Sequence, residues 1–376
     1  MKKIIFVLLV ISSPLLKSAT IHIPSEQATL EDAFNVAQNY DTILIASGTY
    51  SGTGFQNLHI YDDRNLYIVS EEGAENCIFN ITGDFLLLDS DSNQVWEFGE
   101  KIFEGFTFQN GSKVFVSGWN GNIVVKNSIF KNNEYGFIID YPGYGGVENS
   151  KFYGNHCGVY LRGAPEFSFH IYYNLFEKNF FALHLSGLNN PIYYNILFDN
   201  FVGIYSGITY DQFYRNIIYK NQYAIWSYEN FYLIGENNLF YGNDSLFVGS
   251  DFLDSIETHY FKNNYYNEDP LFCDSLLQSI GVYPNSILLP ENNLYNLRIG
   301  NVYEECFYCG DLDWSESAPD ISDLVYLVDF MFNNGPPPVL FETSDFDFSQ
   351  TIDISDLVIL VDFMFTNGPE LQCQQP

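Results

Sequence analysis

A repeat of 21 to 24 residues runs through the middle of this chain and constrains its fold more than any other feature. It is marked by asparagines that follow short apolar segments, namely Asn110, Asn133, Asn155, Asn179, Asn200, Asn221 and Asn243. Three residues after each of the last six stands a small or apolar residue that opens an alternating strand. Short strands at this period, joined by asparagine turns, predict a solenoid whose coils stack in parallel sheets.

The alternation assigns the two faces of these strands, because successive side chains point to opposite sides of a sheet. The inward columns are Phe137, Val159, Leu183, Ile204, Ile225 and Phe247, and Ile139, Leu161, Leu185, Ser206 and Ser227. The outward columns are Ile138, Tyr160, His184, Tyr205, Trp226 and Val248, and Asp140, Arg162, Ser186, Gly207 and Tyr228. With coils about 4.8 Å apart, the aromatic members form an outward strip about 15 Å long.

Composition limits the partners of such a solenoid. The 376 residues carry 47 acidic against 15 basic side chains, a formal net charge of -32. Nucleic acid is excluded as a partner, because phosphate binding requires basic patches. With 47% hydrophobic and 18% aromatic residues, the acidic groups are expected on a folded surface and not in a disordered tail.

The first 19 residues read as a secretory signal peptide, with two lysines before an apolar run and a small-residue site near Ala19. No later stretch is apolar for the roughly 18 residues that a membrane-spanning helix needs. We therefore expect a protein that is secreted, extracellular or held at the cell surface. After the leader, Thr29 and Asp32 form a capping-box pattern that predicts a short helix covering the open end of the coils.

A second duplication lies near the C-terminus. The segments 321–336 and 354–369 match at 14 of 16 positions, and each has apolar residues at helical spacing before an Asn-Gly-Pro stop. The loop before the second helix places oxygen groups at the spacing that Ca²⁺ prefers, with Thr351 acting through its carbonyl. Its expected ligands are Asp345, Asp347, Ser349, Thr351, Asp353 and Asp356.

Two resemblances follow from these motifs. The order of strands, helix and turns from Ile21 onward resembles secreted bacterial right-handed parallel β-helix proteins of the pectate-lyase-like superfamily. The duplicated loop and helix resemble a type I dockerin, a pair of EF-hand-like repeats. Together they imply a signal peptide (1–19), an all-β right-handed parallel β-helix with an N-terminal capping helix (20–275), a linker or edge segment (276–305) and a small α-helical dockerin-like domain (306–376).

The dockerin resemblance implies Ca²⁺ as the bound metal and a cohesin-like protein or cell-surface component as the partner. The partner-binding pairs would be Ile321-Ser322 and Ile354-Ser355. The first loop departs from the pattern, because it is one residue longer and contains Ala318-Pro319. It is still expected to contribute ligands, namely Asp311, Asp313, Ser315, Asp320 and Asp323.

The cysteines divide into two groups. Cys77 and Cys157 are expected as buried free thiols, because their spacing in the solenoid is too large for a disulfide. In the duplicated module, Cys373 is expected to pair with Cys309 or Cys306, and Cys273 is a further candidate. Zinc is disfavoured, because the lone Cys306-x-x-Cys309 has no second ligand pair nearby.

Catalytic groups are sparse. The best constellation is Arg162, with Asp140 one coil before it and His184 one coil after it, although surface pairing explains such residues as well. Tyr160, Tyr205, Trp226 and Tyr228 either pack beneath other chain segments or bind a glycan. We expect polysaccharide binding or processing. The alternatives are a structural surface or adhesion protein without carbohydrate activity and a polysaccharide lyase or glycoside hydrolase acting on acidic glycans.

Overall fold

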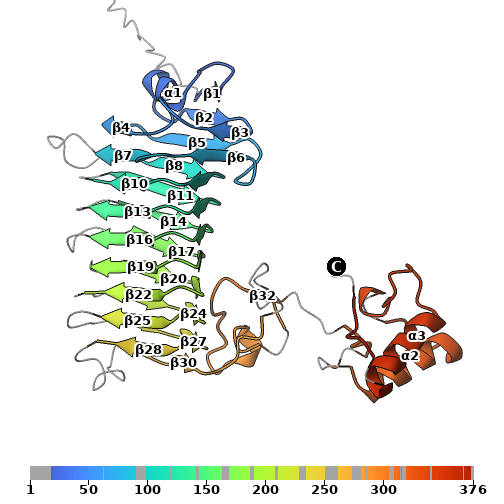
Figure 1. Cartoon of the computed structure of the whole chain (residues 1–376). Helices are drawn as coiled ribbons and strands as arrows, with labels where there is room; N and C mark the ends of the chain where they lie inside the picture. Colours follow the sequence, from blue (N-terminus) through green and yellow to red (C-terminus); the bar gives the residue numbers. More distant parts are fainter. Residues whose placement is uncertain are drawn as a thin grey trace, which may run out of the picture. The chain divides into compact units, whose positions relative to one another are not determined.

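The structure of this chain, a computed structural model, describes residues 18–61, 63–89, 99–118, 121–140, 144–162, 169–186, 190–207, 211–227, 234–249, 261–272, 281–283, 286–304, 309–313, 315, 319–338, 341–366 and 368–373. It divides into two compact units, Met1–Asn264 and Tyr265–Pro376. The first unit is a parallel β-helix of about nine coils, and each coil passes in turn through three sheets (Figure 1). Within each sheet, neighbouring strands come from successive coils and run parallel.

Three sheets, here named A, B and C, line the coils. Sheet A contains β1 (Thr20–Ile23), β2 (Thr42–Ile45), β5 (Leu66–Ser70), β8 (Lys101–Glu104), β11 (Asn122–Lys126), β14 (Tyr144–Glu148), β17 (Phe169–Tyr172), β20 (Pro191–Tyr193) and β23 (Gln212–Tyr214). Sheet B contains β3 (Gly48–Tyr50), β6 (Cys77–Asn80), β9 (Thr107–Gln109), β12 (Ile129–Lys131), β15 (Lys151–Tyr153), β18 (Leu175–Glu177), β21 (Ile196–Phe198), β24 (Ile217–Tyr219) and β27 (Leu239–Tyr241).

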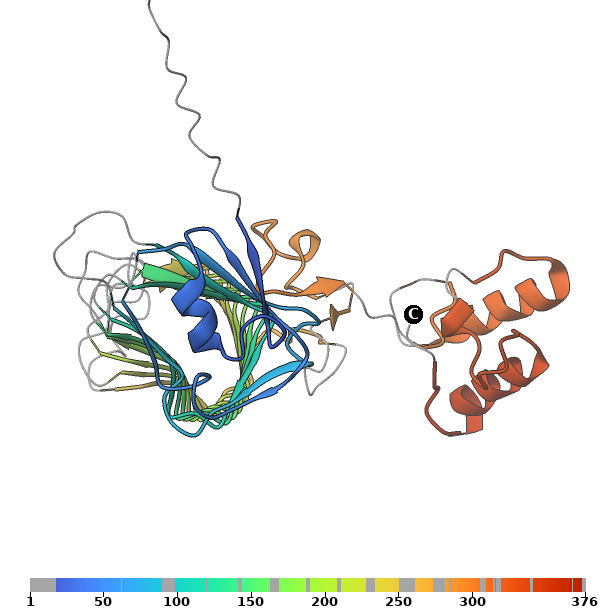
Figure 2. The same cartoon turned by 90° about the horizontal axis from the view of Figure 1, so that it is seen from above.

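Sheet C contains β4 (Leu58–Tyr61), β7 (Leu86–Asp89), β10 (Lys113–Ser117), β13 (Tyr135–Asp140), β16 (Cys157–Arg162), β19 (Phe181–Ser186), β22 (Val202–Ser206), β25 (Tyr223–Ser227) and β28 (Ser245–Val248). A further pair, β26 (Gly235–Glu236) with β29 (Phe261–Lys262), is also parallel. The sequence-predicted helix is present as α1 (Leu30–Val36), whose N-cap Thr29 accepts a hydrogen bond from the Asp32 amide. Seen from above, α1 lies over the N-terminal end of the coils (Figure 2).

Aromatic stacking fills the solenoid core. On sheet B the inward rings of Phe130, Phe152 and Phe176 stack in succession, with centroids 4.4 and 4.7 Å apart. The inward column of sheet C that begins at Phe137 is in register through Val159, Leu183 and Ile204, all buried. Much of the phenylalanine content is therefore core, where each large ring buries apolar area against its neighbours in the adjacent coils.

Asparagine ladders hold the turns together. Between sheets B and C, the amide of each asparagine from Asn133 to Asn221 bonds to the Oδ1 of the next, and the last acceptor is Asn243. The expectation that Asn110 starts this column is wrong, because the backbone amide of Gly111 donates to Asn133 in its place. Asn110 takes the preceding position, whose left-handed backbone angle asparagine tolerates.

A second ladder, which the repeat analysis missed, lies between sheets A and B. It begins with Ser128 and Ser150 and continues through Asn174, Asn195, Asn216, Asn238 and Asn264. The residue before each ladder position again has a positive φ. Two polar ladders thus satisfy the backbone groups that the coil corners would otherwise bury unpaired.

The second unit contains β30 (Tyr265–Tyr266), a parallel pair of β31 (Gly281–Val282) with β32 (Tyr303–Glu304), and the duplicated helices. These are α2 (Ile321–Asn333) and α3 (Ile354–Thr366), with the short turns η1 (Pro290–Asn292) and η2 (Phe341–Thr343). The helices share a small core of Leu312, Leu327, Phe346 and Leu360. No helix among the described residues is long and apolar enough to cross a membrane.

Candidate functional sites

The outward aromatic strip of sheet C is formed as the sequence predicted. Tyr160, His184, Tyr205 and Trp226 are in register on β16, β19, β22 and β25, and each side chain is half-buried. Ile138, predicted to continue this strip outward, is instead 94% buried. The strip therefore begins at Tyr160.

The rings of the strip take two different orientations. Tyr160 and His184 stack nearly parallel, with centroids 4.2 Å apart, so the facing sides of these rings cover each other. Tyr205 is inclined by 72° to His184, and Trp226 by 87° to Tyr205. The parallel stack ends after His184. Tyr205 and Trp226 are therefore the members that are turned out of the parallel stack.

The predicted catalytic constellation is only partly described. The backbone of Asp140 is in register with Arg162, and Arg162 with Ser186, whereas the Asp140 side chain and the whole of Tyr228 lie outside the described residues. Ser186 donates its hydroxyl to the Leu161 carbonyl. Burial lowers the pKa of His184 to about 4, so its imidazole is neutral at pH 7 and is a weak base. This geometry favours a packing role for His184.

A second aromatic surface, on sheet A, was missed at the level of sequence. Tyr172, Tyr193 and Tyr214 are in register on the outer side of β17, β20 and β23. The signal that marks them is the recurrence of Tyr-Tyr-Asn at 172–174 and 193–195 and of Tyr-Arg-Asn at 214–216. The asparagine register assigns faces only to the strands of sheet C that follow it, whereas these tyrosines lie on strands of sheet A.

In the duplicated module, the structure brings carboxylates together into two matching clusters. One contains Asp311, Asp313 and Asp323, and the other Asp345, Asp347 and Asp356. In each cluster, oxygens of the three residues lie within 4.8 Å of one another, and two of the three side chains are buried. Clustered carboxylate oxygens are the donors that a hard cation such as Ca²⁺ prefers.

The two loops have the same local framework. The Ser349 amide donates to Asp345 and Asp347 at 2.9 and 3.0 Å, and the Ser315 amide donates in the same way to Asp311 and Asp313. The Phe346 amide donates to Asp356 at 2.7 Å. Matching bonds in both loops show that the extra residue of the first loop leaves these positions intact. The Ser349 hydroxyl also donates to the Thr351 carbonyl.

Asp320 and Asp353, also predicted as ligands, directly precede α2 and α3. The Oδ1 of each accepts hydrogen bonds from the amide and hydroxyl of the serine two residues later, at 2.6 to 2.8 Å. Asp320 is the N-cap of α2 and forms a capping box with Asp323. These serine bonds lower the pKa of Asp320 and Asp353, whereas burial raises the pKa of Asp323 and Asp356. Asp320 and Asp353 are not among the three clustered residues of their loops, and their role as calcium ligands stays a prediction.

The predicted partner-binding pairs lie at the helix starts, where Ile321, Ser322 and Ile354 are exposed and Ser355 is half-buried. The structure adds residues that the sequence analysis did not select. Val325 and Phe332 on α2, and Val358 and Phe365 on α3, are also exposed. Their exposed fractions match in pairs: 62% and 60% for the valines, and 60% for each phenylalanine. Each helix thus presents the same apolar stripe.

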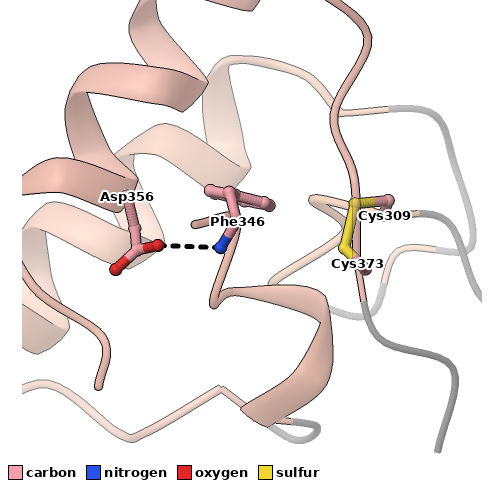
Figure 3. The surroundings of a disulfide bond; sticks show 4 residues. All are labelled: Cys309, Phe346, Asp356 and Cys373. Carbon is pink, nitrogen blue, oxygen red and sulfur yellow. Dashed lines mark hydrogen bonds between the residues drawn. A yellow bond between two sulfur atoms is a disulfide. The ribbon is translucent and has the colours of Figure 1, made fainter. Parts of the chain in front are cut away.

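Cys309 pairs with Cys373, with Cα atoms 5.6 Å apart, beside the Phe346–Asp356 hydrogen bond (Figure 3). The other two candidates, Cys273 and Cys306, lie outside the described residues. Gly310, next to the disulfide, is bounded by Pro319 and Leu371, and its amide donates to the Thr343 carbonyl. The disulfide therefore joins the C-terminal segment to the start of the first loop. Cys77 and Cys157 are buried free thiols, as predicted.

A comparison with protein families supports the fold. The family described as right handed beta helix region matches residues 58–211, from the start of β4 to the residue before β23. The coils accordingly form a right-handed β-helix. One match among solved structures is the complex of alginate lyase AlyF-OU02 with G6, at 15% identity and a TM-score of 0.40, covering 79% of this chain and 72% of that chain. No curated protein matches the chain.

Proposed function

We propose that this chain is an exported protein whose β-helix binds or processes polysaccharide and whose C-terminal dockerin-like module attaches it, with calcium, to a cohesin-like partner or to the cell surface. One observation carries the polysaccharide assignment: the in-register strip of Tyr160, His184, Tyr205 and Trp226 on sheet C. It supplies a narrow aromatic surface along the solenoid axis, with polar hydroxyl, imidazole and indole groups at its edge.

The physical argument is one of amphipathic matching. A sugar ring has an apolar C–H face and a polar rim, and an aromatic ring with a polar tip meets both requirements. Tyr205 and Trp226 supply the turned rings, and the coil spacing repeats an aromatic group about every 4.8 Å. A ligand chain lying along the sheet would meet several of these groups in succession.

Calcium fits the clustered carboxylates of the module. Asp345, Asp347 and Asp356 would hold one ion, with Ser349 and the Thr351 carbonyl nearby in the same loop. The first cluster would use Asp311, Asp313 and Asp323 in the same way. A bound cation would neutralise carboxylates that otherwise repel one another while partly buried, which stabilises the loop conformation. The helix starts would then be held in place for a partner.

The docking surface follows from the two helices. Ile321, Val325 and Phe332 lie on one face of α2, and Ile354, Val358 and Phe365 repeat that face on α3. Exposed apolar stripes of this kind mark protein interaction sites. A partner that binds the stripe on α2 is expected to bind the stripe on α3 as well.

Retention on polysaccharides tests the first half of the proposal. The chain from residue 20 is applied to a panel of insoluble and soluble polysaccharides, and Trp226→Ala is expected to weaken retention roughly tenfold, the equivalent of about 1.4 kcal/mol. Tyr153→Ala, an aromatic change on sheet B, is the matched control and should bind like the wild type. Unchanged retention of Trp226→Ala would remove the strip from the proposal.

Product analysis in the same samples separates binding from processing. Unsaturated products or new reducing ends that vanish in Arg162→Ala indicate an enzyme, and retention without products indicates a binding module. Absence of both leaves the structural alternative. Docking is tested separately with immobilised cohesin domains. Binding should be lost with EDTA and weakened at least tenfold when Val325 and Val358 are both changed to Asp, while Asp362→Asn stays unaffected.

A further inference from the structure

The outer face of sheet A carries a set of tyrosines that the proposed strip on sheet C does not use. Tyr172 and Tyr193 stack at 5.4 Å with planes 18° apart, and Tyr214 follows at 5.4 Å with its plane turned by 82°. Burial raises the pKa of all three, so their hydroxyls are protonated at neutral pH and donate as well as accept hydrogen bonds. The Tyr193 hydroxyl donates to Gln212 at 2.6 Å.

A parallel column stands beside it at the corner that leads to sheet B. Tyr173 and Tyr194 stack at 5.0 Å with planes 9° apart, and the Arg215 guanidinium lies 5.4 Å from the Tyr194 ring. All three have positive φ, between 57° and 60°. The same corner holds asparagine in other coils, at Asn127, Asn149, Asn237 and Asn263.

Large residues occupy a corner position that does not favour them. A left-handed backbone is less favourable for a bulky residue than for asparagine or glycine. Three consecutive coils nevertheless carry Tyr, Tyr and Arg at this position, where asparagine serves in the neighbouring coils. Stacking recovers part of that cost. The large side chains of this corner thus lie in the same coils as the sheet A tyrosines Tyr172, Tyr193 and Tyr214.

A cluster of charged groups lies at one end of this surface. Glu148, in register with Tyr172, contacts Lys126 at 3.1 Å and the His170 Nε2 at 2.7 Å. The His170 ring occupies the space that a side chain at Gly146 would fill, because a Cβ there would lie 2.1 Å from Nε2. The absence of a side chain at position 146 therefore lets the imidazole lie against the sheet and reach Glu148.

We infer that this tyrosine surface, made of Tyr172, Tyr173, Tyr193, Tyr194 and Tyr214 with the Lys126–Glu148–His170 cluster at its end, is a second saccharide-binding site that takes neutral glycans. The inference rests on the proposed function only for the class of ligand. Its residues, sheet and geometry are independent of the strip on sheet C.

Charge argues for this occupant. Another copy of the chain, or an acidic polymer, would meet a net charge of -32 and be repelled, and nucleic acid is excluded for the same reason. An apolar partner would remove the tyrosine hydroxyls and the charged Lys126–Glu148–His170 cluster from water, which is unfavourable. A neutral glycan offers both a C–H face for the rings and hydroxyls for the polar edge.

Affinity electrophoresis of the chain from residue 20 tests the site. The probes are the neutral polysaccharides β-glucan, xylan, glucomannan and galactan, and the anionic polygalacturonate. Tyr193→Ala/Tyr214→Ala is expected to weaken retention on a neutral probe roughly tenfold, and Tyr67→Ala, also exposed on the outer face of sheet A, should leave it unchanged. Tyr193→Phe/Tyr214→Phe keeps the rings and controls for folding, together with circular dichroism of every variant.

The outcomes separate this inference from the proposed function. If Tyr193→Ala/Tyr214→Ala binds every probe like the wild type, or if polygalacturonate is the preferred ligand, the second site is overturned while the strip on sheet C still stands. Retention that survives Trp226→Ala but is lost in the tyrosine double variant supports the second site and removes the first. A wild-type chain that no probe retards overturns both.

Discussion

The Oδ1 atom of Asn155 accepts two hydrogen bonds from Asn133, one from the backbone nitrogen at 2.9 Å and one from Nδ2 at 3.0 Å. This unit repeats along the corner between sheets B and C, so each buried side chain serves the coil on either side. The asparagines that repeat in the sequence are therefore the members of one continuous column of hydrogen bonds. Its stability should depend on every member.

Removing one member should therefore be costly. Asn179→Ala leaves the Asn155 amide and the Phe152 carbonyl without their partners in a buried corner, which is expected to lower the free energy of unfolding by about 3 kcal/mol. Urea unfolding followed by circular dichroism measures the loss. Gln222→Ala, an exposed neighbour of the ladder, should change stability by less than about 0.5 kcal/mol. Equal stabilities of the two variants would contradict the role given to the ladder.

His184 should make stability depend on pH. Its pKa in the folded protein is about 4, below the 6.5 of an unperturbed histidine, so the unfolded chain binds more protons between these two values. Stability contributed by the neutral ring is present above pH 6.5 and is lost as the pH falls toward 4. The difference in unfolding free energy between wild type and His184→Phe, measured at pH 7.5, 5.5 and 4.5, should move against the wild type as the pH falls. A difference independent of pH would place the histidine in solvent.

Calcium should bind to the module, and changing a single cluster carboxylate should remove one binding event. Titration calorimetry of the EDTA-treated chain is expected to show two binding events, and Asp356→Asn should remove one of them and Asp323→Asn the other, because each changes a buried cluster carboxylate. Asp362→Asn, an exposed change within α3, is the matched control. Helix content should fall when calcium is removed. A wild-type chain without binding heat would refute the calcium assignment.

The disulfide should stabilise the module against unfolding. Cys309 and Cys373 are 64 residues apart, and closing such a segment is worth about 2 to 4 kcal/mol through the unfolded state. Cys309→Ser/Cys373→Ser is expected to unfold its helices at lower urea concentration than the wild type, with the transition of the β-helix unchanged. Reducing agent should shift the wild type in the same way and leave the double variant where it is. Coinciding midpoints would show that the bond contributes nothing.

Much of the solenoid was accessible from the sequence, because the coil period, the inward columns and the outward strip all follow from one-dimensional alternation. The residue at which the asparagine ladder starts could not be predicted from the sequence. Asn110 and Gly111 are adjacent, and only the hydrogen bond from the Gly111 amide to Asn133 shows which of them holds the ladder position. A one-residue offset leaves the repeat spacing almost unchanged, so spacing alone does not resolve it.

The candidate sites divide in the same way. The acidic loops, the duplicated helices and the aromatic strip were evident from residue types and their spacing. The sequence alone did not indicate that Tyr160 and His184 stack face to face while Tyr205 and Trp226 turn away, since ring orientation depends on packing between coils. Nor did it indicate that Asp320 is the N-cap of α2 and forms a capping box with Asp323.

The sequence by itself determined that this chain forms a parallel solenoid followed by a duplicated helical module, because periodic burial and loop spacing are local properties of the polymer. Only the tertiary structure decided which residues of different coils meet. It aligned three tyrosines on sheet A, placed the His170 ring over Gly146 and paired Cys309 with Cys373. These contacts join residues about 20 to 60 positions apart, and their geometry is set by the stacking of coils and the packing of helices.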